Sequence, residues 1–148
     1  KQMEHALRIH KHINEYYIQL GECYMQIGQY VEAAGYFGMV VTNKPKQIAG
    51  WEYLIRSLMA NDQLDAALEQ TELAYMSTQG KTVFIYYRSA ILFKMGKSNE
   101  GLLQLEMALS KSAKWLNKFV KFYPEVVQDA KVMTLLSQYK KSKKSKGS

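Results

Sequence analysis

Apolar residues recur at helical spacing on both sides of one glycine in residues 17–45. Before Gly28 the pattern consists of Tyr17, Leu20, Gly21 and Tyr24, and after it of Ala33 and Phe37. Steps of three and four residues predict two amphipathic α-helices, and the glycine between them predicts a tight turn. Pro45 should end the second helix, because proline cannot continue the hydrogen-bond ladder.

The turn of this helix pair recurs along the chain. Gly28, Asp62 and Gly96 follow one another at intervals of 34 residues, and apolar or small residues surround each of them at corresponding positions. Neither helix of such a pair buries its apolar face alone, so successive pairs should stack. The pattern predicts three helix–turn–helix repeats, over residues 14–47, 48–81 and 82–113.

The two ends of the chain extend this frame. Met3 and Ala6 lie 34 residues before Phe37 and Val40, which predicts that residues 1–13 are the second helix of a truncated repeat. Residues 114–139 are expected to form a capping helix pair that completes a single domain over 1–139. Residues 140–148 contain only Lys, Ser and Gly, so we expect a disordered tail there.

The motif from Tyr17 to Pro45 resembles the tetratricopeptide repeat, which has an aromatic residue, Leu-Gly, Tyr, Ala, Phe and Pro at this spacing. The resemblance implies an all-α fold, a right-handed α-solenoid of helix–turn–helix repeats. It also implies a function in recognition, because the first helices of these repeats line a concave groove that binds peptides or helices of other proteins.

The same resemblance implies which residues line the groove. Residues 34 apart on successive first helices should form rows, and these contain Ile18, Glu22, Met25, Glu52, Tyr53, Arg56, Met59, Tyr86, Tyr87 and Phe93. The row Met25, Met59 and Phe93 is apolar and suits an amphipathic helix or a hydrophobic segment of a partner. The same periodicity is expected if this row is part of the core between helices, or if the C-terminal helices cover it.

Members of the family that grip the acidic tail of a chaperone do so with Lys, Asn and Arg side chains in these rows. The corresponding places here hold Ile18, Glu22, Tyr53, Val83 and Tyr87. A chaperone tail is therefore not the expected ligand, and the partner is a protein or peptide of unknown identity.

The formal net charge of +7 depends largely on the end of the chain. Five lysines fall in residues 140–148, and the remaining residues carry 15 basic and 13 acidic side chains, so the expected folded part does not indicate a nucleic-acid-binding face. The lysine tail is either a solubilising segment or an electrostatic contact with nucleic acid, an acidic protein partner or anionic lipid.

Catalytic and metal-binding patterns are missing from the sequence. It has no Gly-rich phosphate loop and no Ser/His/Asp or Cys/His set that the repeat frame would bring together, so we expect no enzymatic activity and no cofactor. His5, His10 and His12 lack companion ligands at metal-site spacing, and the single Cys23 is expected to be a small core residue. No apolar run approaches membrane-spanning length and no signal peptide is apparent, which favours a cytoplasmic location.

These observations favour a non-enzymatic scaffold or adaptor. The first alternative is a regulatory or oligomerisation module of a larger protein, since a chain that starts within a repeat could form a homo-oligomer through the open N-terminal repeat. The second is binding of nucleic acid or an acidic partner through the basic tail.

Overall fold

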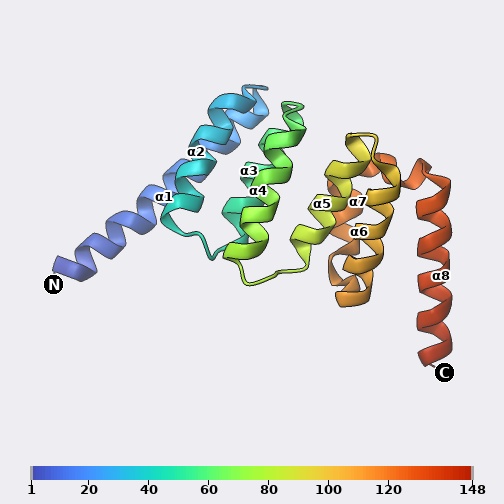
Figure 1. Ribbon diagram of the computed structural model, residues 1–148. Coiled ribbons are helices and arrows are strands. Elements are labelled where there is room, and N and C mark those ends of the chain that lie inside the picture. The colour runs from blue at the N-terminus through green and yellow to red at the C-terminus, as the bar shows by residue number, and fades with distance from the viewer. Residues whose placement is uncertain (1, 148) are drawn as a thin grey trace. The chain divides into compact units, whose positions relative to one another are not determined.

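The structure is a computed structural model that describes the backbone of residues 2–147 and the side chains of residues 12–141. All regular elements within these residues are helical, in agreement with the predicted all-α fold (Figure 1). The chain divides into two compact units, residues 1–80 and residues 81–148.

Unit 1 contains four α-helices that pack in order. They are α1 (Gln2–Gln26), α2 (Tyr30–Asn43), α3 (Ile48–Ala60) and α4 (Leu64–Ser77). Helix α1 packs on α2, α2 on α3, and α3 on α4, and short turns make consecutive helices antiparallel (Figure 1). Unit 1 is therefore built from helix–turn–helix pairs, as the periodicity predicts for residues 14–47 and 48–81.

The three predicted turns have one backbone geometry. Gly28, Asp62 and Gly96 all have positive φ, at 77°, 58° and 80°. The residue after each turn donates its backbone N–H to a carbonyl five residues earlier, with Gln29, Gln63 and Lys97 bonding to Tyr24, Leu58 and Leu92 at 2.9 Å each. This pattern is the Schellman motif that ends a helix in the left-handed conformation. Aspartate tolerates that conformation better than most residues, which explains why Asp62 can replace glycine in the second turn.

The close approach of α1 and α2 explains the glycine of the first repeat. The ring of Phe37, which is fully buried, lies where a side chain at Gly21 would have to be. Ala33 is also fully buried on the same helix as Phe37. The repeat frame therefore places a small residue on α1 against an aromatic residue on α2, and the ring fills the space that the small residue leaves.

Unit 2 begins with a third helix pair and ends with shorter elements. The pair is α5 (Val83–Lys94) and α6 (Ser98–Lys111), and it is followed by the 3₁₀ helix η1 (Ala113–Trp115), α7 (Leu116–Phe122), the 3₁₀ helix η2 (Pro124–Gln128) and α8 (Ala130–Gly147). Both α6 and α7 pack on α5, while α8 contacts α6 and η2. Helix α5 is accordingly the most buried element of the unit, with ten buried residues.

The expected capping helix pair is present as α7 and α8, but Pro124 opens η2 and not a long helix. Helix α8 begins later, at Ala130, where the carboxylate of Asp129 accepts the backbone N–H groups of Lys131 and Val132 at 2.9 and 3.2 Å. Such a cap satisfies two of the unpaired donors at the start of a helix.

The predicted truncated repeat at the N-terminus is wrong, because α1 is one continuous helix from Gln2 to Gln26. The expected turn near residue 13 would need a residue that ends a helix, and no glycine or proline occurs between Gln2 and Leu20. The matches of Met3 and Ala6 to Phe37 and Val40 at an interval of 34 do not by themselves establish a separate helix.

Two further expectations need correction. The sequence predicts a disordered tail from residue 140, but α8 continues through Gly147. Lysine and serine are compatible with such an extension of a helix that has already started. Ser148 lies outside the described residues. Cys23 is exposed and not a core residue, because the buried side of α1 follows Asn14 and Gly21 and leaves Cys23 off that face.

Candidate partner-binding surface

The predicted groove residues of unit 1 lie on α1 and α3. On α1, Ile18 and Met25 are half-buried and flank the exposed Glu22 at helical spacing. On α3, the residues Glu52, Tyr53 and Arg56 are half-buried. We call these six residues the α1–α3 face.

One hydrogen bond joins the two helices at the centre of this face. The hydroxyl of Tyr53 donates to a carboxylate oxygen of Glu22 at 2.6 Å. The bond raises the pKa of Tyr53, and burial of the ring and the negative charge of Glu22 raise it further. The Tyr53 ring also stacks on Phe37 of α2, with the centroids 4.9 Å apart. Tyr53 is thus fixed by α1 through its hydroxyl and by α2 through its ring.

Charged groups surround this tyrosine. The negative charge of Glu52 raises the pKa of Tyr53, whereas the positive charge of Arg56 lowers it, so both groups lie close enough to act on the hydroxyl. The α1–α3 face therefore combines two acids and one base with the apolar side chains of Ile18 and Met25. Such a surface can accept an apolar segment and orient it through charge.

Met59 does not belong to the accessible part of this face. Its side chain is only 7% exposed, and it lies near the end of α3, next to the turn at Asp62. A partner that binds to this structure could reach Met25 but not Met59.

The three groove residues predicted in unit 2 are buried under the C-terminal segment. Tyr86 lies 5.7 Å from Phe119 and Tyr87 stacks on Phe122 at 4.1 Å, both as centroid distances. Phe93 stacks on Tyr123 with centroids 6.0 Å apart. The position of Phe93 therefore agrees with the interpretation in which the C-terminal helices cover the apolar row.

Burial has chemical consequences for Tyr86. Removal from water raises its pKa well above the usual range of tyrosine, and its hydroxyl donates to the backbone oxygen of Ser112 at 2.7 Å. This bond ties α5 to the residue between α6 and η1. Tyr86 accordingly serves the core of unit 2 in this structure.

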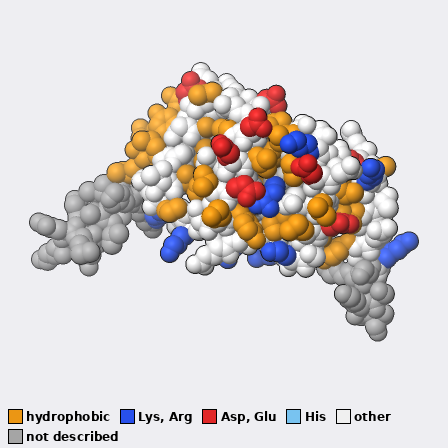
Figure 2. Space-filling model, in the orientation of Figure 1, with side chains coloured by type: hydrophobic (Ala, Val, Ile, Leu, Met, Phe, Trp, Pro, Cys, Tyr) orange, Lys and Arg blue, Asp and Glu red, His pale blue; other side chains and the backbone are white. Residues whose placement is uncertain are grey.

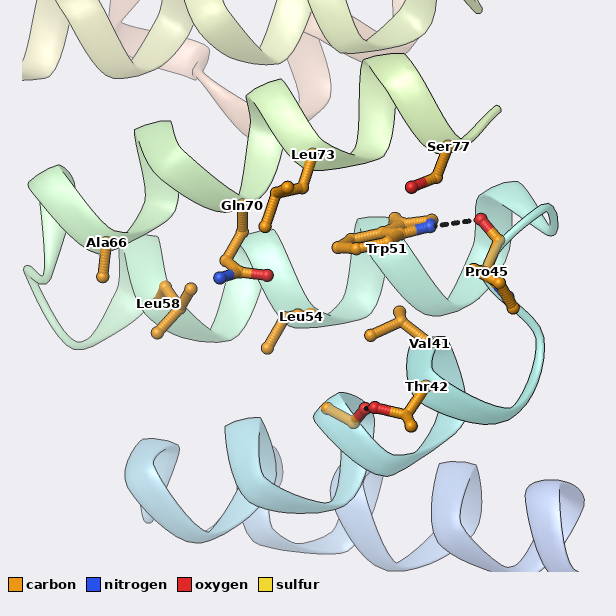
Figure 3. Close-up of a pocket in the computed structure, with 11 residues that line it drawn as sticks. Val41, Thr42, Pro45, Trp51, Leu54, Leu58, Ala66, Gln70, Leu73 and Ser77 are labelled. Atoms are coloured by element: carbon orange, nitrogen blue, oxygen red, sulfur yellow. Dashed lines mark hydrogen bonds between the residues drawn. The ribbon is translucent and has the colours of Figure 1, made fainter. Parts of the chain in front are cut away.

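The structure also contains a cavity that the repeat frame did not indicate. It has a volume of about 580 Å³ and lies on α3 between the second helices α2 and α4 (Figure 3). Trp51 forms its centre, and the indole N–H donates to the carbonyl of Pro45 at 2.7 Å. Its lining includes the small residues Gly38, Ala66 and Ser77. Apolar periodicity does not indicate this cavity, because it does not register the small residues that line it.

The described residues show neither a metal cluster nor a membrane-spanning helix. Among the described side chains, no three His, Cys, Asp or Glu residues lie close enough together to hold a metal ion. No helix in the described part of the chain has the length and apolar character needed to cross a bilayer.

Comparison with known proteins does not place the chain in a family. No protein-family model matches the sequence, and no curated protein matches it. The functional assignment therefore has to come from the residues and their geometry.

Proposed function

We propose that the chain is a non-catalytic protein-binding module of tetratricopeptide-like repeats, arranged as a right-handed solenoid. The repeated Schellman turns at Gly28, Asp62 and Gly96 support the repeat assignment, since they share hydrogen bonds and spacing. The Gly21–Phe37 contact supports it independently, because it explains why the first repeat needs a glycine within a helix.

The observation that carries the functional proposal is the Tyr53–Glu22 hydrogen bond between the first helices of two successive repeats. It fixes a surface on which apolar Ile18 and Met25 lie beside three charged residues. Because two of those charges are negative and one is positive, the fitting partner is a helix or extended segment with apolar anchors and a neighbouring basic residue. The partner's apolar residues provide most of the affinity, and the charges set its direction.

A second candidate function is self-association of a regulatory or oligomerisation module. Val31 and Met39 of α2 are 61% and 47% exposed, and Figure 2 shows hydrophobic side chains gathered over the α1–α2 part of the surface. An apolar helix face of this kind is a common feature of protein interfaces. If Val31→Glu disrupts self-association of the chain and a substitution on the α1–α3 face does not, this second function would be favoured.

Charge reversal on the α1–α3 face tests the proposed function. Glu22→Arg should sharply lower the recovery of the bound partner, because it removes the acceptor of Tyr53 and places a positive charge beside the partner's basic residue. The measurement is quantitative mass spectrometry of proteins that co-purify with the full chain. Glu22 is exposed, so the variant should keep its helical content.

Glu69→Arg is the matched control. It makes the same change at an exposed position on α4, away from the α1–α3 face, and should leave co-purification unchanged. Equal recovery of the same proteins with both variants would contradict the proposed surface.

A further inference from the structure

The two units differ in charge, which the value for the whole chain conceals. Unit 1 carries 6 basic and 9 acidic residues, a formal net charge of −3, whereas unit 2 carries 14 basic and 4 acidic residues, a net charge of +10. The near-neutral average over residues 1–139 arises because an acidic unit offsets a basic one. A charge difference of this size between two parts of a chain indicates a polyanionic partner for the basic part.

Besides the five lysines of residues 140–148, unit 2 has a second group of basic side chains around α7. No acidic residue occurs from Met107 through Pro124, and four lysines fall in that segment, at positions 111, 114, 118 and 121. Lys114 and Lys121 are exposed. Further along the chain, α8 carries Lys131, Lys140 and Lys141, all of them exposed, on a helix whose cap already uses the carboxylate of Asp129.

Trp115 organises the lysines nearest to it. The ammonium groups of Lys114 and Lys118 each lie 5.2 Å from the centre of its ring, within the range of cation–π attraction. Lys121 follows Lys118 by one turn of α7 and therefore emerges on the same side of that helix. We call Lys114, Trp115, Lys118 and Lys121 the α7 basic surface.

From this surface we infer that unit 2 binds nucleic acid through its backbone phosphates, without reading the base sequence. Lysine ammonium groups are point charges that contact phosphates individually, whereas base recognition typically uses the planar fork of arginine. The one arginine of unit 2, Arg88, is half-buried and donates to Gln104 at 3.0 Å. Both lysines at Trp115 lie over its ring, so the indole holds them in place and is not an open platform for stacking.

Other polyanions fit the surface less well. Binding to an anionic membrane draws on apolar side chains that insert between lipids, but the exposed residues of α8 up to Lys141 are polar apart from Met133 and Ala130. An acidic protein segment would be expected to dock in a concave site, and the cavity between α6 and α8 is lined in part by Glu106. The phosphate backbone of a nucleic acid fits a surface that offers an array of separate positive charges.

The inference is tested by neutralising two exposed lysines of the α7 basic surface in the full chain. Lys114→Gln/Lys121→Gln is compared with Lys44→Gln/Lys46→Gln, which removes the same charge from the α2–α3 connection of unit 1. Binding to a fluorescent single-stranded RNA and to a duplex of mixed sequence is measured by anisotropy over a range of salt concentrations. Anionic phosphatidylserine vesicles and polyglutamate serve as the competing polyanions.

We expect the α7 variant to bind several-fold more weakly to RNA at low salt, with the control close to the original chain. For single strands the salt slope should fall by about 1.4, since each lost phosphate contact accounts for about 0.7. Equal weakening by both variants would show that only net charge matters and would overturn the inference. Tighter binding to vesicles or polyglutamate than to either nucleic acid would overturn it as well.

Discussion

Met59→Glu should strongly destabilise the folded protein. The Met59 side chain is 7% exposed, so the substitution places a carboxylate where it is largely removed from water. Burial of an unpaired charge of this kind costs at least about 3 kcal/mol, a large part of the stability of a domain. Thermal unfolding followed by circular dichroism should show a markedly lower midpoint.

Met76→Glu is the control for this substitution. It makes the same chemical change on α4, where Met76 is 74% exposed, and should leave the midpoint nearly unchanged. Equal stability of the two variants would mean that Met59 is accessible in solution, and the sequence-based interpretation of its row as an open groove would then regain support.

Phe119→Ala should destabilise unit 2 by about 3–5 kcal/mol, the usual cost of removing a large buried aromatic ring. Phe119 is fully buried and lies at the centre of an aromatic cluster with Tyr86, Phe122 and Tyr123, at centroid distances of 5.7, 5.6 and 6.4 Å. Its loss would leave a cavity between α5 and α7.

The two tryptophans lie in different units, so the destabilisation of unit 2 can be measured separately from unit 1. Trp51 belongs to unit 1 and Trp115 to unit 2, so in a Trp51→Phe background the fluorescence of Trp115 reports the unfolding of unit 2 by urea. Leu103→Ala, at an exposed position of α6, should move the midpoint little. A Phe119→Ala midpoint that equals this control would show that α7 does not cover α5 in solution.

The repeat frame could be predicted from the sequence because its signals are local. Gly28 and Gly96 adopt the left-handed conformation that glycine allows, and Asp62 adopts it at the expected interval. Gly21 is required by the Phe37 ring on the next helix, a contact between helices joined by a three-residue turn. Short-range constraints of this kind require a particular residue type at a fixed position of each repeat, so they can be recognised in the sequence.

The ends of the chain could not be predicted in the same way. The frame placed a turn near residue 13 on the basis of interval alone, although the intervening residues contain nothing that ends a helix. It likewise treated the lysine-rich end as separate from α8, although a helix that has started can continue through lysine and serine. Apolar periodicity identifies faces more reliably than it identifies boundaries.

The predicted groove residues of unit 1 share a surface, and its role in binding stays a prediction. Glu22 and Tyr53 belong to adjacent rows of the repeat frame, and a hydrogen bond joins them. The same frame predicts Tyr87 beside Tyr53 and Phe93 in the row of Met25, but Phe122 stacks on Tyr87 and Tyr123 stacks on Phe93. That coverage depends on packing between elements about 30 residues apart, and the sequence pattern does not distinguish an aromatic face that is open from one that another helix covers.

Site-specific photo-crosslinking tests the proposed binding function most directly. A photoreactive benzoylphenylalanine replaces Met25 on the α1–α3 face, or Met76 on α4 as the control, in the full chain expressed in cells. We predict a discrete adduct with one partner from position 25 that disappears with Glu22→Arg and is absent from position 76. Absence of any adduct at position 25, or the same adducts from both positions, would contradict the account.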